Sequence, residues 1–233
     1  MQIDLIAQQE TLAQRGAELL AEAARDAIRQ RGQFLFAVSG GTAPWIMFEA
    51  FSKQNVEWDK VHLFQVDERV APDGDPDRNL THLRETLLNR VAMRPENVHP
   101  MPVNEPDLAA AADKYARALK QAAGGEAVLD LVHLGLGPDG HTASLVPGDP
   151  VLEVTDRDVA ITGLYQNRQR MTLTYPTLNR ATKILWLVTG ANKVGPLAQM
   201  LAGDQSIPAG RIQQARAILL ADPAAAAKLN LPK

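Results

Sequence analysis

VLDLVHLGLGPDGHTASL, residues 128–145, begins as an apolar run and ends in a loop punctuated by glycines. A run of about four to eight residues that is rich in Val and Leu and bounded by Gly and Pro is typical of a strand buried on both faces. In open α/β sheets, ligands bind at the loops that follow the carboxyl ends of such strands. Because Asp139 and His141 lie in this loop, the stretch predicts both a buried sheet and a site at its edge.

Strands and helices alternate along the rest of the chain. Apolar runs predict strands at 34–39, 61–66, 128–134, 158–163, 170–174, 183–189 and 216–220. Helical periodicity and composition predict helices at 7–31, 44–51, 79–91, 106–123, 191–202 and 223–229. This alternation is typical of an α/β protein with a mainly parallel sheet flanked by helices on both faces. No repeat or long linker divides the sequence, so we expect one domain spanning residues 1–233.

The composition excludes several classes of function. The 24 Lys and Arg residues and 27 Asp and Glu residues give a net charge of only -3, so we expect neither a nucleic-acid partner nor a membrane partner. The absence of cysteine rules out disulfides, thiolate metal sites and cysteine nucleophiles. The N-terminus is too polar for a signal peptide, and no apolar stretch approaches the roughly 18 residues of a membrane span. We therefore expect a cytoplasmic protein.

A small-residue loop follows the strand predicted at 34–39. Ser39, Gly40, Gly41 and Thr42 lead directly into a predicted helix. Small residues let the backbone approach a ligand closely, and the free N–H groups of a helix start favour a phosphate. A plain glycine turn with an N-capping hydroxyl would give the same pattern, so this loop alone leaves both interpretations open.

Charged residues follow the strand predicted at 61–66. Because charge at the end of an apolar strand is costly unless it is solvated or used, Asp67 and Arg69 are candidate site residues, whereas Glu68 is expected to point elsewhere. The acidic run that follows imitates a calcium loop, but Arg78 and Arg84 stand where that loop needs Gly and Glu. We therefore expect no metal site.

The third loop, residues 135–140, matches the dinucleotide pattern G-x-G-x-x-G formally. That pattern requires a long helix starting at its third glycine, and the breaker pair at 147–148 follows too soon. No dinucleotide cofactor is expected. His141 is better suited to activating water, with Asp139 orienting its imidazole. The other four histidines are interpreted as structural.

Two cations at element boundaries complete the candidate site. Arg170 opens a predicted strand, and Lys193 follows a glycine at a predicted helix start. Arg binds phosphate through paired hydrogen bonds and Lys as a point charge. Together with the 39–42 loop, they predict a phosphate pocket.

Five motifs, in this order, resemble those of the 6-phosphogluconolactonase family. They are SGGTAP (39–44), QVDERVAPDGDPDRN (65–79), LDLVHLGLGPDGHTASLVPG (129–148), RMTLTYPTLN (170–179) and LVTGANK (187–193). The segment GPDGHTASL carries the resemblance most specifically. The resemblance implies a modified Rossmann-type three-layer fold, hydrolysis of 6-phosphoglucono-1,5-lactone to 6-phosphogluconate, a sugar-phosphate substrate and no cofactor.

The resemblance also implies roles for individual residues. His141 matches the family's general base, Asp139 its loop partner and Arg69 a charged group near the lactone or its phosphate, while Arg170 and Lys193 match phosphate ligands. Two departures concern the phosphate loop and the second loop. The family usually reads SGGSTP where this chain has Thr42-Ala43-Pro44, and D-S-N where it has Asp77-Arg78-Asn79.

Two alternatives remain open. In the related glucosamine-6-phosphate deaminases the loop reads D-G-H-I-A-F-N-E-P, and an acid at the position of Asp67 moves a proton between carbons. Here the loop continues HTASLVPG without Asn-Glu-Pro, which favours hydrolysis. The second alternative is a sugar-phosphate-binding protein without catalysis, since a fold does not guarantee an activity. The sequence is compatible with a monomer or a homodimer.

Overall fold

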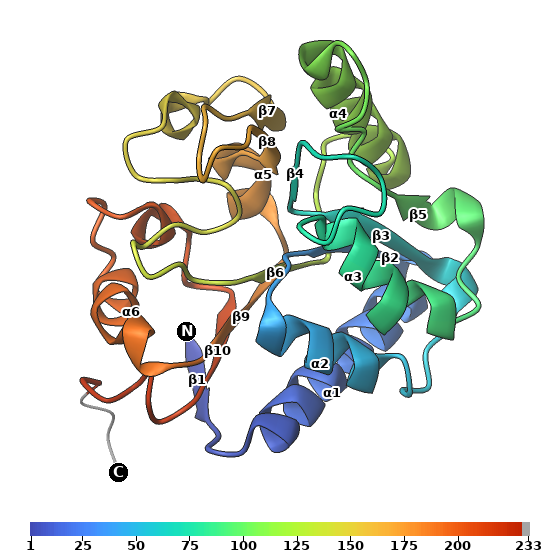
Figure 1. The fold of residues 1–233 in the computed structure, drawn as a ribbon. Coiled ribbons are helices and arrows are strands. Elements are labelled where there is room, and N and C mark those ends of the chain that lie inside the picture. The colour runs from blue at the N-terminus through green and yellow to red at the C-terminus, as the bar shows by residue number, and fades with distance from the viewer. Residues whose placement is uncertain (230–233) are drawn as a thin grey trace.

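The computed structural model describes residues 1–229. Its main sheet has seven strands, and every neighbouring pair is parallel (Figure 1). In spatial order the strands are β1 (Gln2–Leu5), β10 (Ala217–Ala221), β9 (Lys183–Val188), β6 (Leu131–Leu134), β2 (Phe34–Val38), β3 (Val61–Gln65) and β5 (Val98–His99). The predicted α/β class with a mainly parallel sheet is confirmed.

Helices cover both faces of this sheet, because successive side chains of a strand point to opposite faces. On β2, Phe34 and Phe36 pack into a core shared with α1 (Gln9–Arg31), α2 (Thr42–Phe51) and α3 (Asn79–Thr86). Leu35 and Ala37 face the opposite core, which includes α4 (Leu108–Ala123), α5 (Tyr175–Arg180) and α6 (Val194–Leu201). The result is the three-layer arrangement visible in Figure 1.

The longest helix follows directly from its sequence. An Ala and Leu stripe of α1 is buried against the sheet, and α1 ends at Gly32, whose φ of 78° lies in the left-handed region that favours glycine at a helix end. None of the helices in residues 1–229 is both long enough and apolar enough to cross a lipid bilayer.

A second, smaller sheet corrects the expected role of two strands. The segments predicted at 158–163 and 170–174 form β7 (Val159–Ile161) and β8 (Arg170–Leu173), but these pair antiparallel with each other, and β8 also pairs antiparallel with β4 (Asp67–Arg69). Val66 joins the two sheets, since its N–H donates to Val38 of the main sheet and its carbonyl accepts from Leu173 of the small one. Asp67 and Arg69, expected in a loop, therefore stand on a strand.

Several element boundaries also differ from the sequence-based expectation. Residues 223–229, predicted to be helical, form turns, because so short a segment nucleates a helix poorly and the Asp222 carboxylate holds the Ala225 N–H in a local turn. The helix expected at 79–91 ends at Thr86 and continues as a 3-10 turn. The edge strands β1 and β5 and the six-residue helix α5 were not predicted, because each is too short to show a period.

The order of the strands determines where a ligand can bind. From β2 the chain proceeds through β3 to β5 on one side, while β6, β9 and β10 follow one another on the other side. The strand order therefore reverses between β2 and β6. At such a switch point the loops after neighbouring parallel strands diverge and leave a crevice at their carboxyl ends.

Candidate active site

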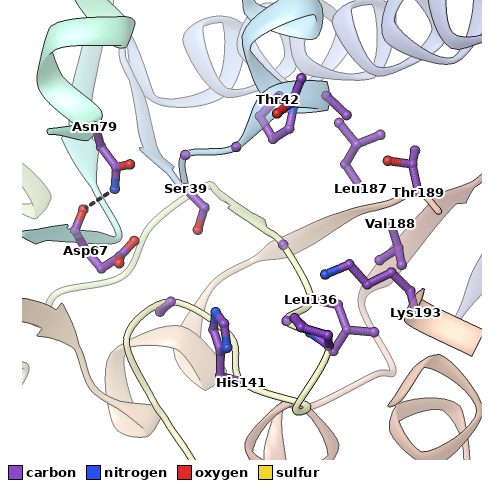
Figure 2. Close-up of a pocket in the computed structure, with 18 of the residues that line it drawn as sticks. Ser39, Thr42, Asp67, Asn79, Leu136, His141, Leu187, Val188, Thr189 and Lys193 are labelled. Carbon is purple, nitrogen blue, oxygen red and sulfur yellow. Dashed lines mark hydrogen bonds between the residues drawn. The ribbon is translucent and has the colours of Figure 1, made fainter. Parts of the chain in front are cut away.

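A cavity of about 380 Å³ opens at this switch point. The segments that follow β2, β3, β6 and β9 line it, including β4, together with Arg170 at the start of β8. Every predicted site residue except Asp139 contributes to the wall: Ser39, Gly40, Gly41, Thr42, Asp67, Arg69, His141, Arg170 and Lys193. Figure 2 shows His141 and Lys193 reaching into the cavity from different sides. The volume of the cavity is in the range of sites that bind small molecules.

Asp139 contacts His141 outside the cavity wall. Its Oδ1 lies 2.5 Å from Nδ1 of His141 and 3.2 Å from the backbone N of the same residue. Burial opposes ionisation of this carboxyl, but the charge and hydrogen bonds of His141 outweigh burial and hold the pKa of Asp139 below its usual value. An ionised carboxylate only accepts hydrogen bonds. In the neutral imidazole of His141, Nδ1 is therefore the nitrogen that carries the proton, and Nε2 is the one with the lone pair.

Gly137 permits this close approach. A Cβ at that position would stand 2.1 Å from His141 Nδ1 and 2.7 Å from Asp139 Oδ1, distances that real Cβ atoms do not adopt. Gly140, with φ of 83°, turns the loop between the two side chains. The chain after Gly140 continues in turns and not as a helix, so the loop lacks the context of a dinucleotide fingerprint.

Asp67 and Arg170 form the buried wall of the cavity. Asp67 is 5% exposed, and its Oδ2 accepts a hydrogen bond of 2.6 Å from Ser144 Oγ. Arg170 is 4% exposed; burial lowers the pKa of its guanidinium, and the charge of Asp67 opposes that effect. Among the described residues, Nε of Arg170 has no hydrogen-bond partner. A buried, incompletely satisfied guanidinium facing a cavity suits an anionic ligand.

Arg69 and Glu68 point in different directions from β4. Arg69 lines the cavity, and its Nη1 donates to Asp77 O at 2.7 Å and Asn79 Oδ1 at 2.9 Å. Glu68 is fully buried away from the cavity and forms an ion pair of 3.2 Å with Arg78. The expectation that Glu68 points elsewhere is confirmed.

Lys193 supplies a third cation from the loop after β9. Burial lowers the pKa of its ammonium group, and the negative charge of Asp139 opposes that shift. Lys193 therefore shares its electrostatic environment with the His141–Asp139 pair. Three cations, Arg69, Arg170 and Lys193, face one cavity.

The 39–42 loop brings backbone close to the cavity. At Gly40 a Cβ would stand 2.1 Å from Asn79 Oδ1, and Gly41 has a φ of 138° immediately before α2. The first N–H groups of α2 have no partner within the helix, and the loop that carries them lines the cavity. Ser39 Oγ is buried with no hydrogen-bond partner in the described part of the chain.

Sequence reasoning missed residues that support this site. Ser144 donates to Asp67, and Tyr165 donates to Asp139. Asn79 donates to the Asp67 carbonyl (Figure 2) and accepts from Arg69. Ser144 and Asn79 lie inside the quoted motifs, so their position was a usable signal. Tyr165 lies in a polar segment with no motif, and only the fold brings it to the loop of Asp139. Residues 1–229 contain no cluster of three or more His, Asp or Glu side chains arranged to hold a metal.

The fold and the cavity together define an α/β protein with a cation-lined pocket at a strand switch point. The chain belongs to the family of glucosamine-6-phosphate isomerases and 6-phosphogluconolactonases, whose model matches residues 7–220. It is 37% identical over 237 residues to a 6-phosphogluconolactonase of Nostoc sp., covering 98% of each chain. It is 34% identical over 241 residues to one of Mycobacterium tuberculosis, covering 97% of this chain and 98% of the relative.

Solved structures agree with this assignment. The 6-phosphogluconolactonase of Thermotoga maritima superimposes with a TM-score of 0.84 at 26% identity, covering 95% of this chain and 98% of the other. The enzyme of Trypanosoma brucei gives a TM-score of 0.83 at 27% identity, covering 98% of both chains. A monomeric glucosamine-6-phosphate deaminase shares the fold, with a TM-score of 0.82 at 19% identity over 97% of this chain and 99% of the other.

Proposed function

We propose that this protein hydrolyses 6-phospho-D-glucono-1,5-lactone to 6-phospho-D-gluconate, with His141 as the general base. The observation that carries the proposal is the placement of the His141–Asp139 pair and three cations around one cavity of about 380 Å³. Near-full-length similarity to enzymes named 6-phosphogluconolactonase supports the choice of substrate.

The cations and the 39–42 loop would bind the phosphate of the substrate. Arg170 offers paired donors, Lys193 offers a point charge and the start of α2 offers free N–H groups. Binding energy from the phosphate would fix the distant carbonyl carbon C1 near His141. Because phosphate binding would position the carbon that reacts, a lactone without a phosphate should be a poor substrate.

Hydrolysis would then proceed by base-assisted attack of water. Nε2 of His141 takes a proton from water as the water oxygen bonds to C1, and the carbonyl electrons move onto its oxygen. Arg69 or nearby backbone N–H groups stabilise that oxyanion. As the oxyanion collapses, the bond from C1 to the ring oxygen breaks, and the imidazolium returns the proton to that oxygen. Asp139 stabilises the imidazolium throughout.

The two alternative functions, a deaminase and a sugar-phosphate-binding protein, would need different residues at this site. Asp67 lines the cavity, as a proton-transferring acid of a deaminase would, but no Asn-Glu-Pro follows the His141 loop, and the position of the deaminase glutamate is occupied by Val146, which is 7% exposed. A protein that only binds sugar phosphates would keep the cations without needing the ordered His141–Asp139 pair. The geometry therefore favours hydrolysis.

A direct assay tests the proposal. Freshly generated 6-phosphogluconolactone should disappear faster with the protein than by spontaneous hydrolysis, whereas glucosamine 6-phosphate should be unchanged and unphosphorylated gluconolactone should react slowly. His141→Ala should lower kcat by about 10²- to 10⁴-fold, the usual contribution of a general base, with little change in KM. Wild-type protein that does not exceed the spontaneous rate refutes the activity, and an unchanged kcat for His141→Ala refutes the role of the histidine.

A further inference from the structure

The segment between β7 and β8 ends in a tight turn that presents one tyrosine to the site. Tyr165 and Arg168 exchange two backbone hydrogen bonds, from Tyr165 N to Arg168 O at 3.0 Å and from Arg168 N to Tyr165 O at 3.2 Å. The two residues between them, Gln166 and Asn167, have φ of 52° and 62°. A two-residue turn with positive φ at both central positions is rigid and matches the twist of its flanking strands. The turn therefore fixes the backbone from which the Tyr165 side chain projects.

Tyr165 contacts both functional parts of the site without lining the cavity. Its hydroxyl donates to Asp139 Oδ2 at 3.1 Å. Its ring lies with its centroid 4.9 Å from Cζ of Arg170 and meets the His141 ring edge-on, with the centroids 5.5 Å apart. One side chain thus contacts the proton-transfer pair and the buried guanidinium.

We propose that Tyr165 is a positioning residue that couples the His141–Asp139 pair to the anion-binding Arg170. Its hydroxyl fixes Asp139, and its ring fixes Arg170. This inference rests on the proposed lactone hydrolysis for its kinetic consequences, but the couplings themselves are properties of the unliganded protein.

The hydroxyl contact gives the second oxygen of Asp139 a partner, since His141 contacts only the first. Oδ1 faces His141 Nδ1 and Oδ2 accepts from Tyr165, so the carboxylate cannot rotate without losing a hydrogen bond. Burial and the neighbouring charge of Asp139 raise the pKa of Tyr165, and the phenol stays a donor at neutral pH. The donated hydrogen bond also withdraws negative charge from Asp139. Without it the carboxylate would stabilise a protonated imidazole more strongly.

The ring contact acts on Arg170. A guanidinium over an aromatic face gains cation–π attraction, and the gain increases where water is excluded. On the same turn, Gln166 Oε1 accepts from Arg170 Nη2 at 2.9 Å. The flat guanidinium is therefore held by the ring and by the amide, while its Nε has no partner among the described residues. Losing the ring should weaken anion binding more than proton transfer.

Two substitutions separate these effects. Tyr165→Phe keeps the ring and removes the hydroxyl, so kcat should fall by about three- to tenfold, as expected for one partly exposed hydrogen bond to a charged group, with KM within twofold. The acidic limb of the pH profile should move to higher pH. Tyr165→Leu removes the ring as well and should also raise KM by about tenfold, within the range of a desolvated cation–π contact.

Tyr175→Phe is the matched control. The Tyr175 hydroxyl donates to Pro208 O at 3.2 Å, and Arg211 stands 5.8 Å from its ring centroid, but none of these three residues lines the cavity. This control removes the same kind of hydroxyl beside the same kind of cation. Because these residues lie outside the cavity wall, Tyr175→Phe should leave kcat, KM and the pH profile unchanged.

Proton NMR of the unliganded protein tests the coupling without relying on activity. The midpoint of the His141 imidazole titration should rise in Tyr165→Phe. The charged groups that face the His141–Asp139 pair, Lys193 and Arg170, are present in both the wild type and Tyr165→Phe.

Calorimetry with inorganic phosphate tests the contact with Arg170. Phosphate should bind Tyr165→Leu more weakly than Tyr165→Phe. The proposal is overturned if Tyr165→Phe leaves both the His141 midpoint and kcat unchanged. It is also overturned if Tyr165→Phe and Tyr165→Leu have equal phosphate affinity and equal KM. If wild-type protein lacks lactonase activity, the midpoint and phosphate binding still decide the coupling.

Discussion

Gly137 controls the distance between the two side chains that carry proton transfer. It belongs to the loop after β6, and its φ is not in the left-handed region, so an alanine backbone fits there. The methyl group does not fit, because its carbon would stand 2.1 Å from His141 Nδ1. Gly137→Ala must therefore displace the imidazole or the Asp139 carboxylate.

We expect Gly137→Ala to lower kcat by about 10²-fold, because a misplacement of about 1 Å of a reacting group can have that effect. The melting temperature should change little, since the loop is at the surface of the cavity. Gly125→Ala is the control, because a Cβ there meets nothing within 4 Å and the position lies after α4. Steady-state kinetics on the lactone would measure the difference. Wild-type kcat in Gly137→Ala would show that the pair tolerates displacement.

At the scale of elements, Glu68 ties β4 to the start of α3. Its carboxylate accepts from the backbone N–H groups of Asn79 and Leu80, each at 2.8 Å, and pairs with Arg78, which is 2% exposed. The carboxylate thus satisfies free N–H groups of a helix start and neutralises a buried cation. Because Asn79 and Arg69 line the cavity, this junction also fixes one side of the site.

Glu68→Gln should lower the free energy of unfolding by about 3 kcal/mol, since removing one charge of a buried ion pair leaves the other uncompensated. Urea denaturation followed by tryptophan fluorescence measures this loss. Asp107→Ala, which removes an exposed N-cap of α4, should cost only about 1 kcal/mol. A loss for Glu68→Gln no larger than for Asp107→Ala contradicts the proposed importance of the junction.

At the scale of the whole molecule, the buried His133 and the half-buried His99 link stability to pH, because burial favours their neutral forms. Burial lowers the pKa of His133 to about 3, and burial with the neighbouring His62 lowers the pKa of His99 to about 4. In the unfolded chain these imidazoles take up protons below about pH 6.5. The unfolded state then binds more protons than the folded state, so acid favours unfolding.

The free energy of unfolding should therefore fall as the pH drops below about 6.5 and should level off for each histidine below its folded pKa. The slope is at most about 1.4 kcal/mol per pH unit per histidine, and less for the partly exposed His99. Denaturant titrations between pH 7.5 and 4.5 would measure it. His133→Gln should reduce the slope of the free energy of unfolding against pH by the contribution of about one proton. Equal slopes in wild type and His133→Gln would refute the linkage.

The local sequence was sufficient to predict the main elements and several of the residues that line the cavity. Apolar runs such as FLFAV and LVHL form buried strands whatever their neighbours, because their side chains have no other way to leave water. Small or charged residues directly after such runs had to collect at one edge of the sheet, since parallel strands end on the same side. Ser39, Asp67, His141 and Lys193 were predicted for this reason, and they line one cavity.

Only the tertiary structure decided how distant segments pair and which side chains support the site. The split into two sheets depends on Val66 bonding to Val38 on one side and Leu173 on the other, a pairing that no local pattern encodes. The same holds for Tyr165, which reaches Asp139 from 26 positions away in the sequence. A sequence determines which segments must be buried and where polar residues interrupt them. Contacts between distant segments depend on the packing of the whole core, because each possible pairing of segments competes with all the other pairings that the chain could form.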